Sequence, residues 1–96
     1  MNNRRRSPRN PINVAVNITA PDRPDQIGVS RDLSDGGMLF HSLSRFDVGI
    51  RVQLLFRTGE HEETVAGRVV RASKDQAWSF YPHATAVAFV DPAKPE

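Results

Sequence analysis

Apolar and polar residues alternate along two segments of this 96-residue chain. From 12 to 19, Ile and Val alternate with Asn, Ala and Thr, and from 50 to 57 Ile, Val, Leu and Phe alternate largely with Arg and Gln. A period of two places one set of side chains on one face of a strand, so both segments are predicted to be half-buried strands. Four further stretches, apolar or rich in valine, are predicted as strands: 27–32, 38–40, 64–72 and 84–90.

Turn signals separate these strands. The segments PDRPD at 21–25, SDGG at 34–37 and TGEH at 58–61 combine residues that favour turns, and 42–49 is predicted as a loop or a single helical turn. No stretch has the period of an amphipathic helix. The pattern therefore predicts an all-β fold, a small six-stranded antiparallel β-barrel that is closed or nearly closed and has little helix.

The barrel is expected to occupy residues 12–90. Residues 1–11 are polar and basic and include Pro8 and Pro11, so they are expected to form a flexible N-terminal arm. Residues 91–96 are expected to be a frayed C-terminal tail. A chain of 96 residues is long enough for one domain and too short for two.

Charge is distributed unevenly along the chain. Of its 13 basic and 11 acidic side chains, four arginines and no acid lie within the first nine residues, so the rest of the chain is slightly acidic. The four are Arg4, Arg5, Arg6 and Arg9. The basic side chains are almost all arginine rather than lysine. This preference favours planar, bidentate recognition of phosphate or guanine over the diffuse attraction of a general nucleic-acid binder.

Composition excludes several classes of site. Without cysteine, the chain has no disulfide, thiolate nucleophile or cysteine-based zinc site, and it is compatible with a reducing cytoplasm. No apolar run approaches the ~20 residues of a membrane-spanning helix, so no membrane insertion is expected. His41, His61 and His83 have no metal-site spacing and are expected on the surface or in loops. With no nucleophile–base pair either, we expect no enzymatic activity and no cofactor.

A loop predicted at 74–82 contains three aromatic residues, Trp78, Phe80 and Tyr81. They could form a patch for a partner or a platform on which nucleobases stack, but plugging one end of the barrel is the favoured interpretation. Glu60, Glu62 and Glu63 are expected to form a solvated face of a hairpin.

Two short motifs carry the candidate chemistry. Arg5–Arg9 has the spacing R-x-x-x-R and follows Arg4, and Asp32–Gly37 has the spacing D-x-S-x-x-G at the end of a predicted strand. Each alone is a weak signal, because basic tails and Asp-Ser-Gly turns are common. Together, in this order and flanking a strand, they resemble the cyclic di-GMP signature of the PilZ family. The resemblance covers roughly residues 4–90 and implies a PilZ barrel that binds this bacterial second messenger.

The chemistry of cyclic di-GMP suits these residue types. A guanidinium can pair with a phosphate or with the O6/N7 edge of guanine, whereas a carboxylate accepts from the opposite edge. The resemblance implies that the arginines bind phosphate and guanine while the acid–serine–glycine corner frames a guanine. Arg4 is expected to stack on a second guanine, and the glycines to allow close approach and a positive φ. The candidate site is Arg4, Arg5, Arg9, Asp32, Ser34, Gly36 and Gly37.

We therefore expect a bacterial, cytoplasmic receptor without catalysis of its own. Ordering nine arm residues would cost on the order of 10 kcal/mol. Several charge-assisted hydrogen bonds of roughly 1.5–3 kcal/mol each could offset this cost. Ligand binding would then order the arm and create a surface for an unidentified protein partner. Two alternatives remain open: a small nucleic-acid-binding barrel, and a barrel that has lost the ligand and serves only as an interaction module.

Overall fold

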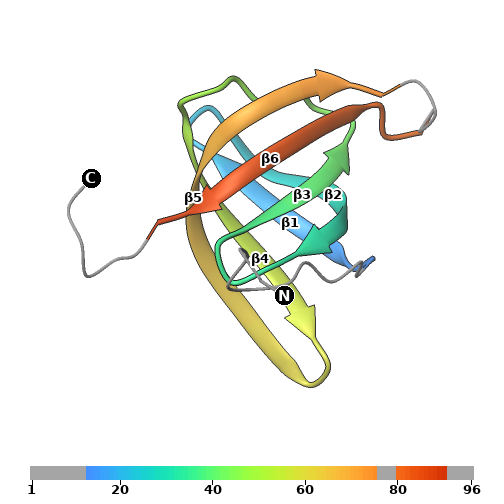
Figure 1. Ribbon diagram of the computed structural model, residues 1–96, viewed down its shortest axis with the longest axis vertical. Coiled ribbons are helices and arrows are strands. Elements are labelled where there is room, and N and C mark those ends of the chain that lie inside the picture. The colour runs from blue at the N-terminus through green and yellow to red at the C-terminus, as the bar shows by residue number, and fades with distance from the viewer. Residues whose placement is uncertain (1–12, 76–79, 91–96) are drawn as a thin grey trace, which may run out of the picture.

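Six strands make up the computed structural model, which describes residues 13–75 and 80–90 (Figure 1). Every pairing is antiparallel, and the strands close a barrel in the order β1-β2-β3-β6-β5-β4. The described residues contain no helix. The predicted six-stranded antiparallel barrel is therefore confirmed. The strands are β1 (Ala15–Ala20), β2 (Arg23–Leu33), β3 (Gly37–Ser42), β4 (Arg51–Thr58), β5 (His61–Lys74) and β6 (His83–Phe89).

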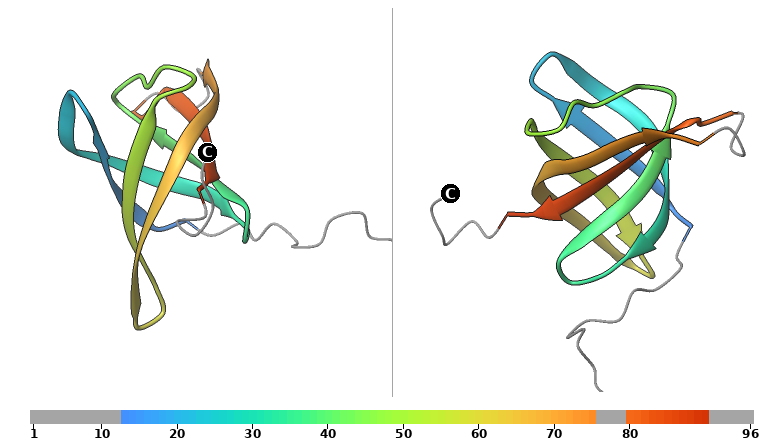
Figure 2. Two further views of the ribbon diagram at one scale, coloured as in Figure 1. Left: turned by 90° about the vertical axis from the view of Figure 1, so that its left-hand side faces the viewer. Right: turned by 45° about the horizontal axis from the view of Figure 1, so that its top comes forward.

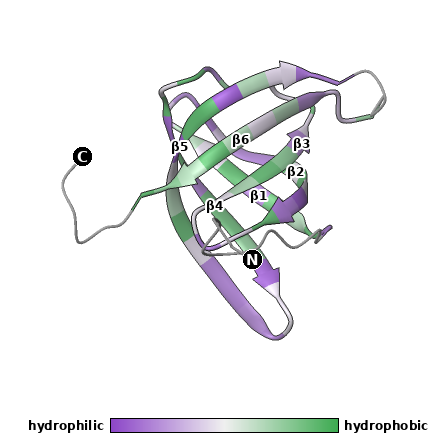
Figure 3. Ribbon diagram, in the orientation of Figure 1, coloured by the Kyte–Doolittle hydropathy of each residue, from purple (hydrophilic) through white to green (hydrophobic). Residues whose placement is uncertain are grey.

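The sequence pattern underestimated two strands, β2 and β5. β2 begins at Arg23, inside the predicted turn at 21–25, and β5 begins at His61, directly after a tight turn in which Gly59 has a φ of 63°. The polar start of β5 pairs with the end of β4 and extends beyond the barrel, as Figures 2 and 3 show. The three glutamates of this hairpin are exposed, as predicted: Glu60, Glu62 and Glu63.

Alternation along the strands divides the core from the surface. In β4, Val52, Leu54 and Phe56 are buried, whereas Arg51 and Gln53 are exposed. Removal of such a side chain from water contributes about 1.5–3 kcal/mol. The buried hydrophobic residues come from β1, β3, β4, β5 and β6 and from the β3–β4 connection: Val16, Ile18, Ala20, Met38, Phe40, Phe46, Val52, Leu54, Phe56, Val69 and Val87.

Phe46, rather than the predicted aromatic residues, packs across one end of the barrel. It belongs to the irregular β3–β4 connection, which has no helical turn, and meets Phe40 edge to face at 6.0 Å between ring centroids. The Arg23 guanidinium lies 5.6 Å from the Phe46 ring centroid. Phe80 is 82% exposed, so its predicted place as a plug is wrong, and Trp78 lies outside the described residues.

Candidate functional site

The corner between β2 and β3 is closed by its own backbone and by one serine. The Ser34 amide donates to the Gly37 carbonyl at 2.9 Å, and the Gly36 amide donates to Ser34 Oγ at 3.3 Å. Serine suits this position because its short side chain can accept from a backbone amide two residues later. Ser34 therefore stabilises the corner as well as lying within the predicted site.

Gly37 begins β3 in tight contact with β6. A Cβ atom at this position would lie 2.3 Å from the Val87 carbonyl oxygen, which is a backbone atom that cannot rotate away. A Cβ at Gly36 would meet nothing within 4 Å. Neither glycine has a positive φ, so that part of the prediction is wrong; the close approach at Gly37 is to β6.

Four of the predicted site residues line one shallow cavity of about 330 Å³. They are Asp32, Ser34, Gly36 and Gly37, contributed by the end of β2, the corner and the start of β3. Asp32 and Ser34 are half-buried. The D-x-S-x-x-G motif therefore contributes a continuous edge to a cavity.

Arg71, which sequence analysis did not single out, lies at the other side of this cavity. In register, Asp32 pairs with Leu39, Leu39 with Ala86, and Ala86 with Arg71, so one row crosses four strands. Three strand spacings separate the two charged residues, which is about 14 Å. Small or apolar side chains lie between them. The cavity therefore presents a carboxylate and a guanidinium at opposite margins of an apolar floor.

Asp32 and Arg71, the charged residues at the two margins, each come directly after a register shift in their strand. The register of β2 shifts between Ser30 and Asp32, and that of β5 shifts between Val69 and Arg71. A β-bulge adds one residue to a strand and redirects the side chains that follow. Because this shift depends on the pairing of distant strands, the local pattern around Arg71 carried no signal for it.

Arg4, Arg5 and Arg9 lie outside the described residues, so their predicted place in the site stays a prediction. The chain that follows them enters the barrel beside β2. Asn13 Nδ2 donates to the Ser30 carbonyl at 2.8 Å, and the Val14 amide donates to Ser30 Oγ at 3.0 Å. β1 and β2 are antiparallel, so moving toward the N-terminus along β1 means moving toward the end of β2, where the corner begins.

A buried histidine lies on β3, two residues after Leu39, which lines the cavity. His41 is fully buried on β3, so its predicted place on the surface or in a loop is wrong. Its Nδ1 lies 3.1 Å from the Tyr81 carbonyl, and its Nε2 lies 3.5 Å from Arg31 Nη1. A carbonyl can only accept and a guanidinium can only donate, which requires the neutral ring with its proton on Nδ1. Arg31 also lies 3.8 Å from a carboxylate oxygen of Asp75.

Burial is the largest influence on this imidazole and lowers the pKa of His41 below its ordinary value of 6.5. The hydrogen bond with the Tyr81 carbonyl opposes this effect, the Arg31 charge lowers the pKa again, and Asp75 raises it. The balance keeps His41 neutral in the folded chain at a pH where an unfolded chain begins to take up a proton.

Stability is expected to fall as the pH is lowered through 6.5, because below that value the unfolded chain binds a proton at His41 more readily than the folded chain does. At higher pH this residue imposes no such cost. Urea unfolding at several pH values checks this, and His41→Gln should flatten the dependence. His61→Gln, at the exposed start of β5, is the matched control and should retain it. An unaltered slope in the His41 variant would contradict the assignment.

Other kinds of site find no support within residues 13–75 and 80–90. No group of three or more His, Cys, Asp or Glu side chains in these residues could hold a metal ion. No helix there is long and apolar enough to cross a membrane.

Solved structures with the same fold share little sequence with this chain. The inhibitor of motility of Bacillus subtilis (MotI/DgrA) matches with a TM-score of 0.71 and 19% identity over 93% of this chain, which spans 44% of that protein. The PilZ domain of YcgR from Escherichia coli, solved with c-di-GMP, matches with a TM-score of 0.72 and 17% identity, covering 95% of this chain and 82% of that one.

The PilZ domain of CeSA from a cellulose-synthesizing bacterium matches with a TM-score of 0.67 and 20% identity, covering 91% of this chain and 85% of that one. None of the curated proteins compared with this chain matches it. The sequence model of the PilZ domain, by contrast, matches residues 3–96, almost the entire chain. This chain therefore belongs to the PilZ domain family.

Proposed function

We propose that this chain is a cyclic di-GMP receptor that acts by binding and not by catalysis. The observation that carries the proposal is the shared cavity: four of the six residues of the D-x-S-x-x-G segment line it together, and Arg71 faces them across it. Membership of the PilZ family and the fold shared with the YcgR domain that was solved with c-di-GMP support the choice of ligand.

The margins of the cavity match the two kinds of group in the ligand. The Asp32 carboxylate can accept from the N1 and N2 donors of a guanine, and the Arg71 guanidinium can donate two parallel hydrogen bonds to a phosphate. Leu39, Ala86 and Ala88 between them leave room for a planar base on an apolar surface. Arg4, Arg5 and Arg9 would complete the site from the N-terminal arm.

Arm ordering would turn ligand binding into a signal. In this proposal residues 1–11 form the arm, 12–90 the barrel and 91–96 the tail. Like charges within the arm repel one another without ligand, and the two phosphates offset that repulsion when the ligand binds. The ordered arm and the adjoining barrel surface would then contact a protein partner, in the cytoplasm of a bacterium.

Isothermal titration calorimetry with cyclic di-GMP tests the site through Asp32→Asn. We expect about tenfold weaker binding, because the amide turns a donor toward the donor edge of guanine and loses the charge-assisted bond. Asp22→Asn is the control: Asp22 is exposed in the β1–β2 turn, outside the cavity, and its substitution should leave affinity unchanged.

Two results would count against the proposal. One is unchanged affinity in Asp32→Asn. The other is an absence of heat with cyclic di-GMP, together with binding of an arbitrary oligonucleotide that weakens steeply between low and high salt. The second result would favour the nucleic-acid-binding alternative.

A further inference from the structure

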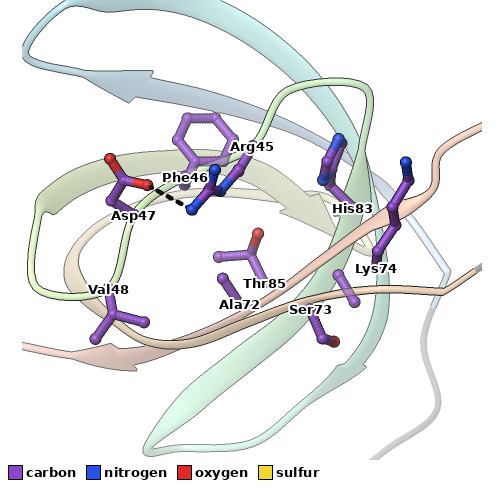
Figure 4. Close-up of a pocket in the computed structure, with 10 residues that line it drawn as sticks. Arg45, Phe46, Asp47, Val48, Ala72, Ser73, Lys74, His83 and Thr85 are labelled. Carbon is purple, nitrogen blue, oxygen red and sulfur yellow. Dashed lines mark ion pairs between the residues drawn. The ribbon is translucent and has the colours of Figure 1, made fainter.

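A second, larger cavity of about 480 Å³ shares no residue with the first. It lies between the β3–β4 connection, the end of β5 and the start of β6 (Figure 4). In the β3–β6 pair, Ser42 faces His83 at this end, whereas Gly37 faces Ala88 at the end that holds the first cavity. The two cavities are thus reached from opposite ends of that strand pair.

Thr85 is the buried polar group of this second cavity. The residue is 1% exposed, and its Oγ1 is the buried side-chain polar atom that has no hydrogen-bond partner among the described residues. Figure 4 shows this oxygen directed toward the side of the cavity where Arg45 and Phe46 lie. Its register partners, Phe40 and Ala72, are apolar. A valine would fill the same volume without an unpaired hydroxyl, so packing alone does not account for threonine here.

The rim of the cavity is basic and partly apolar. Arg45 and Lys74 contribute two positive charges, and Asp47, which lies 3.5 Å from Arg45, contributes one negative charge. Val48 lines the cavity although it is 62% exposed. Two more large apolar side chains are exposed on the connections that border the cavity: Leu43 and Phe80. An exposed apolar side chain beside basic groups suits contact with a protein segment better than binding of a free anion.

We propose that this cavity docks an acidic segment of a partner protein. One apolar side chain of the segment packs against Val48, its carboxylates lie near Arg45 and Lys74, and one of its oxygens accepts from Thr85 Oγ1. The inference rests on the proposed function in one respect only, namely that the receptor acts through protein contact. It places that contact away from the corner that holds the messenger.

The probe is a blocked pentapeptide with a central leucine between two pairs of aspartates, titrated into the ¹⁵N-labelled full chain at millimolar concentration. Amide shifts are expected in the β3–β4 connection and near Thr85, with and without cyclic di-GMP. A peptide with lysines in place of the aspartates, and one with alanine in place of the leucine, should bind more weakly.

Two variants make the test specific. Thr85→Val should raise the melting temperature of the free chain by a few degrees, because it removes a buried hydroxyl that has no partner among the described residues. The same substitution should weaken binding of the peptide by at least about threefold. Lys74→Ala should also weaken binding of the peptide about threefold. Arg57→Ala, which removes an exposed charge outside both cavities, should leave it unchanged.

The proposal would be overturned if the lysine peptide bound as well as the aspartate peptide. Amide shifts confined to Asp32–Gly37 would also overturn it. A Thr85→Val variant that melts at a lower temperature and binds the peptide normally would also overturn it. Cyclic di-GMP binding is measured separately by calorimetry. A chain that binds the messenger but not the peptide therefore contradicts this inference alone, and a chain that binds only the peptide contradicts the receptor function alone.

Discussion

Replacement of Arg9 by alanine is expected to weaken cyclic di-GMP binding by at least ~2 kcal/mol, about 30-fold in Kd. In the proposed site this guanidinium pairs with a phosphate or a guanine, and its loss leaves a desolvated partner without a charge-assisted hydrogen bond. Isothermal titration calorimetry on the wild-type chain and the variant measures the difference. Because the effect comes from contact and not from folding, the melting temperature of the free chain should stay the same.

The matched control for this substitution is Arg51→Ala. Arg51 is exposed at the start of β4 and lines neither cavity, so its loss lowers the net charge equally without touching the site. Equal weakening in both variants would show that Arg9 contributes only long-range attraction and makes no specific contact with the ligand. Full affinity in Arg9→Ala would show that the N-terminal arm takes no part in binding.

Gly37→Ala is expected to destabilise the fold by about 2–3 kcal/mol. The added methyl group would lie 2.3 Å from the Val87 carbonyl oxygen, so β3 and β6 must separate at the point where the Asp32–Gly37 corner is attached. Urea unfolding followed by circular dichroism measures the loss. Binding of cyclic di-GMP should weaken as well, because the corner lines the cavity.

Gly36→Ala provides the comparison within the same corner. Nothing lies within 4 Å of a Cβ at that position, and its φ is not positive, so we expect a change of less than ~0.5 kcal/mol. If both substitutions destabilise equally, the close approach of Gly37 to β6 is not the cause. The pair therefore separates a steric requirement of the barrel from a general preference of turns for glycine.

The alternation of apolar and polar residues was sufficient to predict the strands that have one apolar face. Residues 12–19 and 50–57 alternate, and β1 and β4 occupy most of each stretch. It failed where polar residues continue a strand beyond the core. The first residues of β5, His61 to Glu63, resemble a loop in sequence, yet they pair with β4 because the hairpin is held by backbone hydrogen bonds and needs no apolar face.

Burial of single residues was less predictable. Phe46 lies in a segment with no regular period, and its position across the end of the barrel depends on Phe40 and Arg23 from other strands. His41 occupies an outward position of β3 in the alternation, but Tyr81 and Asp75 from the chain between β5 and β6 lie beside it. Both cases depend on contacts between segments that are far apart in the chain.

By itself, the sequence determined an all-β barrel, the D-x-S-x-x-G corner and a basic leader before the first strand, because alternation, turn residues and charge are properties of neighbouring positions. Only the tertiary structure decided that Arg71 lies opposite Asp32 and that the buried Thr85 hydroxyl has no hydrogen-bond partner within residues 13–75 and 80–90. These two facts depend on the register of β2, β3, β5 and β6 and on two strand irregularities. Register is set by how all six strands pack together, and no short segment encodes it.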